Sequence, residues 1–293
     1  MTDNELDGIL PVDKPEGPTS HDIVARARRA LGIRRIGHTG TLDPFASGLL
    51  LLCVGRSTRL AEYLTGLDKT YRAVARLGAS TDTDDRAGTV LATSEDWSSL
   101  TPTQVEAALH ALEGPQLQVP PAYSAKKVAG ERMYERARRG EAVVLSPVPV
   151  TVRRIEMLGL RLPDVELEIE CSSGTYIRAL ARDLGERLGV GAHLTALRRT
   201  RIGAHDIGTA LPAERLDDLE AVRAAWIGPA EALRHLPRVD VSAPQAVEIG
   251  HGGPIFAPDA LGKHEQVVVC EGGELIAIAE STGGMLRPRK VFR

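Results

Sequence analysis

Two kinds of hydrophobic pattern alternate along the chain, and each predicts one kind of element. Residues 20–31 carry apolar side chains at helical spacing, begin at Ser20 and stop before Gly32, which predicts a helix. Residues 69–77 alternate between apolar and polar positions, as in a strand buried on one face. Residues 49–54 are apolar without a break, which is typical of a buried strand.

The same patterns predict the other elements and a change of architecture near the end of the chain. Further helices are expected after Ser57 up to Gly66, from Pro102 to a stop at Gly114, over the basic residues 131–139, and from residue 175 onward. A strand is expected at 165–171, and short strands at 266–271, 274–280 and 287–292. The fold class is therefore α+β, with one large mixed domain over residues 1–235 and a small β-rich module over 236–293.

Composition narrows the class of protein. With 293 residues, 43% hydrophobic and 26% charged, the chain is typical of a globular protein with a sizeable core. The three cysteines lie far apart, which indicates neither a disulfide framework nor a zinc knuckle and fits a reducing compartment. The acidic, polar start and the shortness of every apolar run predict a cytoplasmic protein that makes no contact with a membrane.

Charge leaves two interpretations open. The net charge of −3 argues against a protein that coats nucleic acid without specificity. The arginines nevertheless cluster, and their planar forks suit phosphate, although solvated helix faces would give the same composition. The clusters are Arg26, Arg28, Arg29, Arg34 and Arg35; Arg132, Arg136, Arg138 and Arg139; Arg198, Arg199 and Arg201; and Arg287, Arg289, Lys290 and Arg293.

The loop GHTGTLDP at 37–44 displays a single carboxylate before the apolar run. It lacks the lysine of a phosphate-binding P-loop, the third ligand of a metal site and the GxSxG pattern of a serine nucleophile. What remains is Asp43, which is either an ordinary turn residue or a nucleophile or general base kept ionised by a nearby cation.

Several blocks, in order, decide between these interpretations, because together they resemble the TruB family of pseudouridine synthases. They cover the chain from about residue 8 to residue 203. The blocks are KPEGPTS at 14–20, GHTGTLDPFASGLL at 37–50, KTYR at 69–72, LGASTDTDDRAG at 77–88, PPAYSAKKVAGERMYERAR at 120–138, SSGTYIRALARDLG at 172–185 and LRRTRIG at 197–203.

The resemblance implies roles for individual residues. Asp43 corresponds to the catalytic aspartate, Arg178 to the arginine that pairs with it, and Tyr71 to the tyrosine that lies against the target base. The residues expected to contact RNA are His38, Tyr176, Leu197, Asp85, Arg132, Arg136, Arg139, Arg198 and Arg199. Among these, His38 would enter the RNA loop in place of the flipped nucleotide, and Leu197 would close the floor of the pocket.

The resemblance also implies a fold and an activity. It implies a mixed catalytic sheet, an inserted loop at about 117–147 that clamps RNA, and a C-terminal module like the RNA-binding PUA domains. The expected reaction is isomerisation of uridine 55 in the T loop of tRNA by a monomer that uses no cofactor, no metal, no guide RNA and no obligatory protein partner. Two alternatives stay open, a tRNA-folding chaperone that uses the same surface, and a synthase with another RNA target such as the guide-dependent relatives, which the insertion disfavours.

Overall fold

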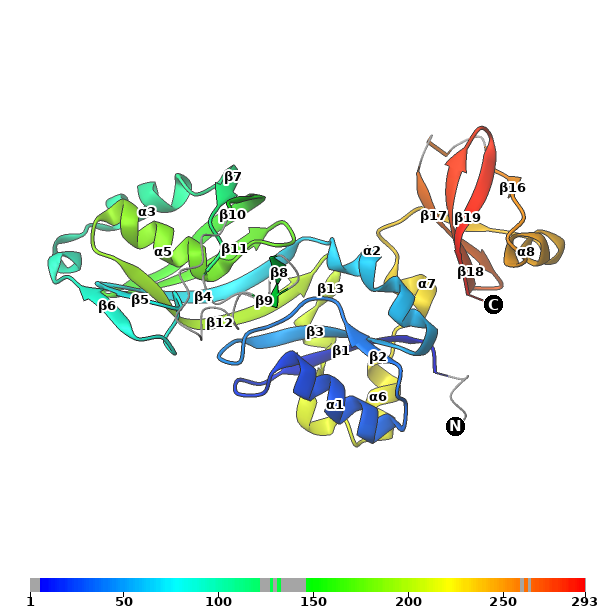
Figure 1. Ribbon diagram of the computed structural model, residues 1–293, viewed down its shortest axis with the longest axis horizontal. Helices are drawn as coiled ribbons and strands as arrows, with labels where there is room; N and C mark the ends of the chain where they lie inside the picture. Colours follow the sequence, from blue (N-terminus) through cyan, green and yellow to red (C-terminus); the bar gives the residue numbers. More distant parts are fainter. Residues whose placement is uncertain are drawn as a thin grey trace.

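A ten-stranded mixed sheet forms the body of the protein in a computed structural model that describes residues 6–121, 127–128, 131–132, 146–258, 261–262 and 265–292 (Figure 1). The strands run in the order β14-β1-β3-β12-β4-β11-β10-β7, with β2 beside β3 and β13 beside β12. Their bounds are β1 Gly8–Lys14, β2 Ile36–His38, β3 Ser47–Val54, β4 Lys69–Leu77, β7 Gly114–Gln118, β10 Val148–Arg161, β11 Asp164–Cys171, β12 Ala192–Ile202, β13 His205–Asp206 and β14 Leu211–Pro212.

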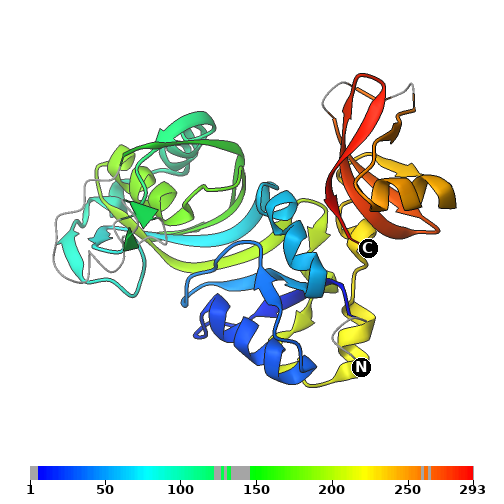
Figure 2. The same ribbon diagram turned by 45° about the vertical axis from the view of Figure 1, so that its right-hand side comes forward.

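The sheet consists of two halves that meet at a short seam. Strand β12 pairs with β4 along most of its length, but it pairs with β3 only at Arg198 with Ser47 and Arg199 with Gly48. Gly48 has φ +108°, and a Cβ atom there would lie 2.2 Å from the carbonyl oxygen of Arg199. The backbones therefore approach so closely that only glycine fits at this position. Figure 2 shows the two halves diverging on either side of the seam.

Each half is covered by its own helices. Helix α1 (Ser20–Leu31) lays Ile23, Val24 and Ala27 on β1 and β3, is capped at its start by Thr19, and ends at Gly32 in the left-handed conformation. Helices α3 (Pro102–His110) and α5 (Ile177–Leu188) cover the other half. The opposite face of β3 packs under the 3-10 helix η1 (Gly55–Leu60) and helix α2 (Ala61–Thr65), so this strand is buried on both faces.

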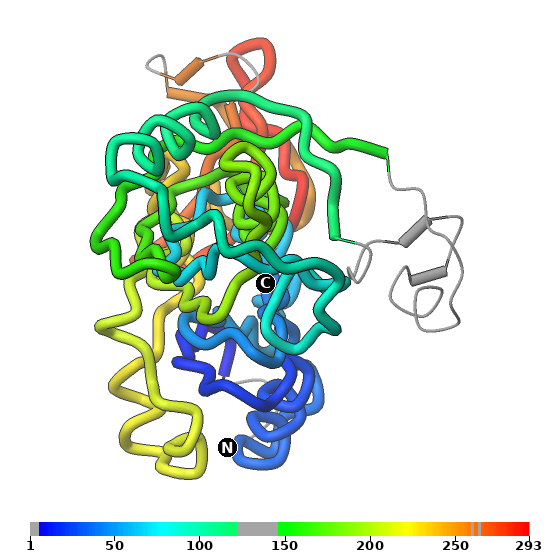
Figure 3. The backbone as a smooth tube through the Cα atoms, turned by 90° about the vertical axis from the view of Figure 1, so that its left-hand side faces the viewer, coloured from blue at the N-terminus to red at the C-terminus, as the bar shows by residue number. Residues whose placement is uncertain are grey.

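The chain between the sheet and the C-terminus covers the end of the first half and then forms a separate small sheet. Its first elements are η3 Ile207–Thr209, η4 Ala213–Arg215, α6 Leu219–Ala225 and α7 Pro229–Ala232. Figure 3 shows this segment at the same end of the molecule as α1, where Arg26 pairs with Asp217. The small sheet has the order β15-β17-β18-β19-β16, and α8 packs against it. Its elements are β15 Arg238–Asp240, α8 Ala243–Gly250, β16 Ile255–Phe256, β17 Gln266–Glu271, β18 Glu274–Thr282 and β19 Met285–Val291.

The small sheet also shares an apolar core with the body, because Val268, Ile278 and Phe292 pack with residues of β3 and α2. The remaining short elements are the hairpin β5 Ala79–Thr81 and β6 Val90–Thr93, the 3-10 helix η2 Asp96–Ser99, and the pair β8 Lys127–Val128 and β9 Glu131–Arg132. None of the helices in the described residues is long and apolar enough to cross a membrane.

The α+β class and most elements expected from the sequence are confirmed, including α1, β3, β4, β11, α5 and the three C-terminal strands. Two predictions are wrong in detail. Gly114 does not end a helix, because α3 stops at His110 and Gly114 begins β7. Residues 131 and 132 are a strand rather than the start of a basic helix, and the rest of that expected helix lies outside the described residues. The hydrophobic pattern also did not reveal β12, which forms the seam.

Candidate active site

The loop between β2 and β3 is anchored so that Asp43 stands at the seam. The backbone N–H and carbonyl of Leu42 both bond to the hydroxyl of Ser20, the first residue of α1, at 2.9 and 3.2 Å. The carbonyl of Pro44 accepts a hydrogen bond from the N–H of Gly17, and Leu42 itself is buried. Both sides of the aspartate are therefore fixed by contacts with the first half of the sheet.

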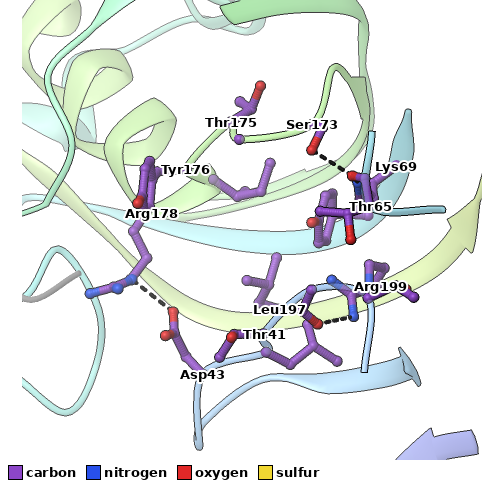
Figure 4. Close-up of a pocket in the computed structure, with 16 residues that line it drawn as sticks. Thr41, Asp43, Thr65, Lys69, Ser173, Thr175, Tyr176, Arg178, Leu197 and Arg199 are labelled. Carbon is purple, nitrogen blue, oxygen red and sulfur yellow. Dashed lines mark hydrogen bonds and ion pairs between the residues drawn. The ribbon is translucent and has the colours of Figure 1, made fainter. Parts of the chain in front are cut away.

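Arg178, from the second half, faces this carboxylate across the seam (Figure 4). Its Nε lies 3.0 Å from Oδ2 of Asp43, and its Nη1 lies 3.4 Å from Oδ2 of Asp85. Nη1 also donates to the carbonyl of Thr83 at 2.8 Å. The side chain of Arg178 is 6% exposed, so the guanidinium is held in one orientation with a carboxylate on two sides.

The environment of Asp43 raises its pKa above the ordinary aspartate value. Burial by the surrounding loop and helix is the largest cause, and Asp85 adds to it, while Arg178 opposes the shift. The side chain still keeps 37% of its surface open toward the pocket. The cation expected from the sequence is present, but it offsets burial only in part, so the ionised form of Asp43 depends on Arg178.

A pocket of about 280 Å³ opens beside the carboxylate and is lined from both halves of the sheet. Leu197 pairs with Ala73 in the register of β12 and β4, so it shares a face with Tyr71 two residues away. Tyr71 and Leu197 are 8% and 7% exposed and form an apolar wall. Burial raises the pKa of Tyr71, so its phenol stays protonated near pH 7.

The start of α5 supplies a second aromatic side chain. Tyr176 lines the pocket immediately before the helix. Its N–H donates to Oε1 of Gln118 at 2.8 Å, and its carbonyl accepts from Nε2 of the same side chain at 3.1 Å. The end of β7 therefore fixes the backbone of Tyr176, two residues before Arg178.

His38 lies outside this pocket lining, at the end of β2. Its ring meets that of His21 edge to face with centroids 5.3 Å apart, and its Nδ1 accepts from the N–H of Gly40 at 3.3 Å. Burial and the neighbouring His21 and Arg199 lower the pKa of His38 to about 4, so the ring is neutral at pH 7.

Two arginines expected to contact RNA occupy other places. Arg199 is 2% exposed, donates from Nε to the carbonyl of Leu49 at 2.7 Å and from Nη2 to that of Gly40 at 3.0 Å, and forms part of the pocket wall. Arg198 pairs with Asp13 at 2.6 Å. The Arg199 guanidinium is therefore buried, and Arg198, whose side chain is 42% exposed, is paired with a carboxylate; RNA contact by either residue stays a prediction. Arg136 and Arg139 lie outside the described residues, as does the side chain of Arg132.

Sequence reasoning missed Lys69 as a pocket residue. Its Nζ donates to the carbonyls of Thr65 and Leu67 at 2.6 Å each. Burial, with Arg199 nearby, lowers its pKa to about 8. The signal was present, because Lys69 precedes Tyr71 by two residues on a strand and therefore shares its face. Among the described residues no group of three or more His, Cys, Asp or Glu could hold a metal ion.

Sequence comparisons match this chain to one protein family over most of its length. Residues 28–177 match the model of the TruB family pseudouridylate synthase N-terminal domain, and residues 178–236 match that of the tRNA pseudouridylate synthase B C-terminal domain. The tRNA pseudouridine synthase B of an Arthrobacter species is 44% identical over 98% of this chain and 97% of its own length. The enzyme of the same name from Symbiobacterium thermophilum is 48% identical over 85% of this chain and 83% of its own.

A solved structure shares the whole fold. A chain of an H/ACA ribonucleoprotein bound to a substrate RNA containing 2'-deoxyuridine superposes with a TM-score of 0.77 at 25% identity. The match covers 98% of this chain and 85% of that one, and therefore includes the C-terminal module as well as the large sheet.

Proposed function

The chain belongs to the TruB family of pseudouridylate synthases, and we propose that it isomerises uridine 55 in the T loop of tRNA to pseudouridine without a guide RNA. The observation that carries the proposal is the contact of Asp43 with Arg178 beside a pocket walled by Tyr71 and Leu197. The names of the relatives supply the RNA class, and the geometry supplies a reactive carboxylate next to a cavity for a base.

The reaction is an isomerisation, so no atoms are gained or lost overall. The bond between N1 of uracil and C1′ of the ribose breaks, and a bond between C5 and C1′ forms, while C5 loses a proton and N1 gains one. Asp43 can attack C1′, attack the base or remove a proton from the ribose, and each of these roles requires its ionised form. Arg178 favours the ionised form, because its positive charge beside the carboxylate opposes the rise in the pKa of Asp43.

The target base must leave its stack, which costs a few kcal/mol. Stacking on an aromatic ring returns about 1–3 kcal/mol per base. Tyr71 offers such a ring inside the pocket, and Leu197 closes the wall that keeps a detached uracil in place. His38, neutral at pH 7, suits insertion into the RNA loop where the base used to lie. Tyr176 lines the same pocket. Asp85 helps to orient Arg178 through its contact with Nη1 of the guanidinium.

The rest of the molecule fits binding of free tRNA. We place the catalytic domain at residues 1–235 and assign the insertion at about 117–147, with Arg132, Arg136 and Arg139, to clamping the RNA. Residues 236–293 form the C-terminal module, for which we propose a PUA-like RNA contact. The enzyme is expected to act as a monomer in the cytoplasm, where tRNA is found, with no cofactor, metal or obligatory protein partner.

The test is modification of an unmodified tRNA transcript by the purified protein in the presence of EDTA. Pseudouridine is mapped by carbodiimide treatment and primer extension. Wild type is expected to give one stop, at position 55, and Asp43→Asn is expected to give none while it still binds the tRNA. Asp68→Asn is a matched control, because Asp68 also meets an arginine Nε at 3.0 Å and is also 37% exposed, but it lies outside the pocket lining.

Other outcomes would favour the alternatives. Binding without modification by wild type would indicate the tRNA-folding chaperone. A stop at another uridine, or modification of another RNA, would keep the enzyme class and change the target. Modification by Asp43→Asn at the wild-type rate would contradict the assigned role of the carboxylate.

A further inference from the structure

Four arginines surround the end of α1 without a carboxylate partner among the described residues. Arg28 and Arg29 lie in the last turns of the helix, and Arg34 and Arg35 lie in the loop after it; all four are exposed. In the part of the chain that the structure describes, none of them forms an ion pair with Asp or Glu. We call these four residues the α1-end patch.

The α1-end patch gathers four exposed arginines without an ion pair, whereas such arginines are few on the rest of the described surface, where Arg161, Arg187 and Arg287 are examples. Many arginines there are neutralised by a carboxylate, namely Arg26, Arg72, Arg76, Arg86, Arg153, Arg154, Arg198, Arg201, Arg215, Arg238 and Arg289. On a chain with a net charge of −3, a concentration of unpaired positive charge produces a local field that the rest of the protein does not cancel.

The backbone holds the patch together. Gly32, with φ +69°, ends the helix and turns the chain, so that Nη2 of Arg28 reaches the carbonyl of Ile36 at 2.7 Å. Nε of Arg35 donates to the hydroxyl of Thr58 at 2.8 Å. Each of these bonds engages one of the five N–H groups of a guanidinium, which leaves the others for a ligand. The forks are therefore partly ordered before any ligand binds.

The patch leads directly to the residue expected to enter the RNA loop. Strand β2 begins immediately after Arg35 and ends at His38 (Figure 1). Three residues of extended strand span about 10 Å. A nucleic acid whose loop lies at His38 would therefore reach the α1-end patch if its backbone followed β2 back toward α1.

We propose that the α1-end patch binds the phosphate backbone of the tRNA stem next to the flipped uridine. This inference rests on the proposed function for the identity of the RNA. The chemistry is that of planar guanidinium forks on phosphate oxygens, which positions the RNA without reading its sequence. The patch therefore contributes to affinity and its dependence on salt, and leaves the rate of the isomerisation step unchanged.

The experiment measures tRNA affinity of the full chain from about 100 to 400 mM KCl, for wild type and for Arg28→Gln/Arg29→Gln/Arg34→Gln/Arg35→Gln. Each lost contact should flatten the slope of log affinity against log salt by about 0.7–0.9, so the expected change is about 3. The single-turnover rate at saturating protein should stay within about twofold of wild type. Arg29→Gln/Arg34→Gln, which removes no hydrogen bond among the described residues, should give about half the change in slope.

A matched control removes the same charge from neutralised positions, with Arg72→Gln/Arg76→Gln/Arg153→Gln/Arg154→Gln. Its slope should change by less than 1. An unchanged slope in a folded patch variant, or an equal change in the control, would overturn the proposal. If wild type binds tRNA without modifying it, and the slope of log affinity against log salt is flattened in the patch variant, the phosphate-binding role of the patch is supported and the proposed function fails. If wild type modifies tRNA and the patch variant has the wild-type slope, the proposed function is supported and the phosphate-binding role of the patch is wrong.

Discussion

Arginines are placed in opposite ways at the start of α5 and at the end of α1. On α5, Arg178 and Arg182 lie one turn apart, with side chains 6% and 22% exposed, and face the consecutive carboxylates Asp85 and Asp84 at 3.4 and 3.1 Å. At the end of α1, four exposed arginines face no carboxylate in the described chain. The first pair has its charge compensated inside the protein, and the second set keeps its charge for a partner.

The α5 pair shows what compensation achieves. Asp84 adopts φ +59°, which is uncommon for a residue other than glycine, and its carbonyl accepts from the N–H of Leu194 on β12. Arg182 joins this turn to the end of β7 by donating to the carbonyl of Val119 at 3.0 Å. The turn that presents Asp85 to Arg178 is thus tied to two other segments. The paired arginines of α5 thus hold the turn in place, whereas the unpaired arginines of the α1-end patch can attract a negatively charged partner.

Arg178→Lys should produce the largest effect on kcat. It is the strictest test of the claim that the paired arginines of α5 hold the geometry of the site. A lysine ammonium cannot meet both Asp43 and Asp85 through a planar fork. Losing one preorganised charge-stabilising contact in an active site costs about 10²–10³ in rate, so kcat should fall at least about 100-fold. Single-turnover kinetics on tRNA would measure it, with Arg187→Lys, an exposed position on the same helix, as the control. Near-normal turnover would remove Arg178 from the proposed mechanism.

Arg182→Gln should have an intermediate effect on kcat, because Arg182 pairs with Asp84, the residue before the Asp85 that contacts Arg178. We expect kcat to fall about tenfold, which corresponds to 1.4 kcal/mol, with KM for tRNA unchanged. An altered KM with an unchanged kcat would mean that Arg182 belongs functionally with the α1-end patch. Circular dichroism on the same samples would verify that the variant is folded.

Asp84→Asn should have the smallest effect and sharpens the comparison through pH. Burial raises the pKa of Asp84 from 3.8 to about 6, although Arg182 opposes the shift. The folded state therefore holds this proton more tightly than the unfolded state, so the stability contributed by Asp84 falls as the pH rises from about 4 to about 6. The asparagine variant escapes this loss, and its Tm relative to wild type should rise across that window.

A gain of about 1 kcal/mol would raise Tm by about 2 °C at pH 7, because the unfolding entropy of a chain of 293 residues is about 0.6 kcal/mol per degree. Asp217→Asn, which removes a carboxylate that is 69% exposed from an arginine 3.0 Å away, is the control at the surface. A Tm difference for Asp84→Asn that is constant from pH 4 to pH 7 would contradict the assigned burial of this charge.

The sequence by itself determined the local helices and strands and which residues are candidates for the pocket. Helix α1 and strands β3 and β4 could be predicted because their caps and hydrophobic periods depend only on neighbouring residues. The resemblance to the family singled out Asp43, Arg178, Tyr71 and Leu197, and the structure brings all four to one pocket. Their catalytic roles stay predictions that the variants above test.

Only the tertiary structure decided which arginines are available to a partner. Arg198, Arg199 and the residues of the α1-end patch look alike in the sequence, yet one is neutralised by Asp13, one is buried in the pocket wall and four are free of carboxylates in the described chain. The same holds for the pKa of Asp43, which burial raises despite its arginine. The physical reason is that exposure, charge compensation and desolvation depend on what packs from distant segments, here across the seam between β3 and β12.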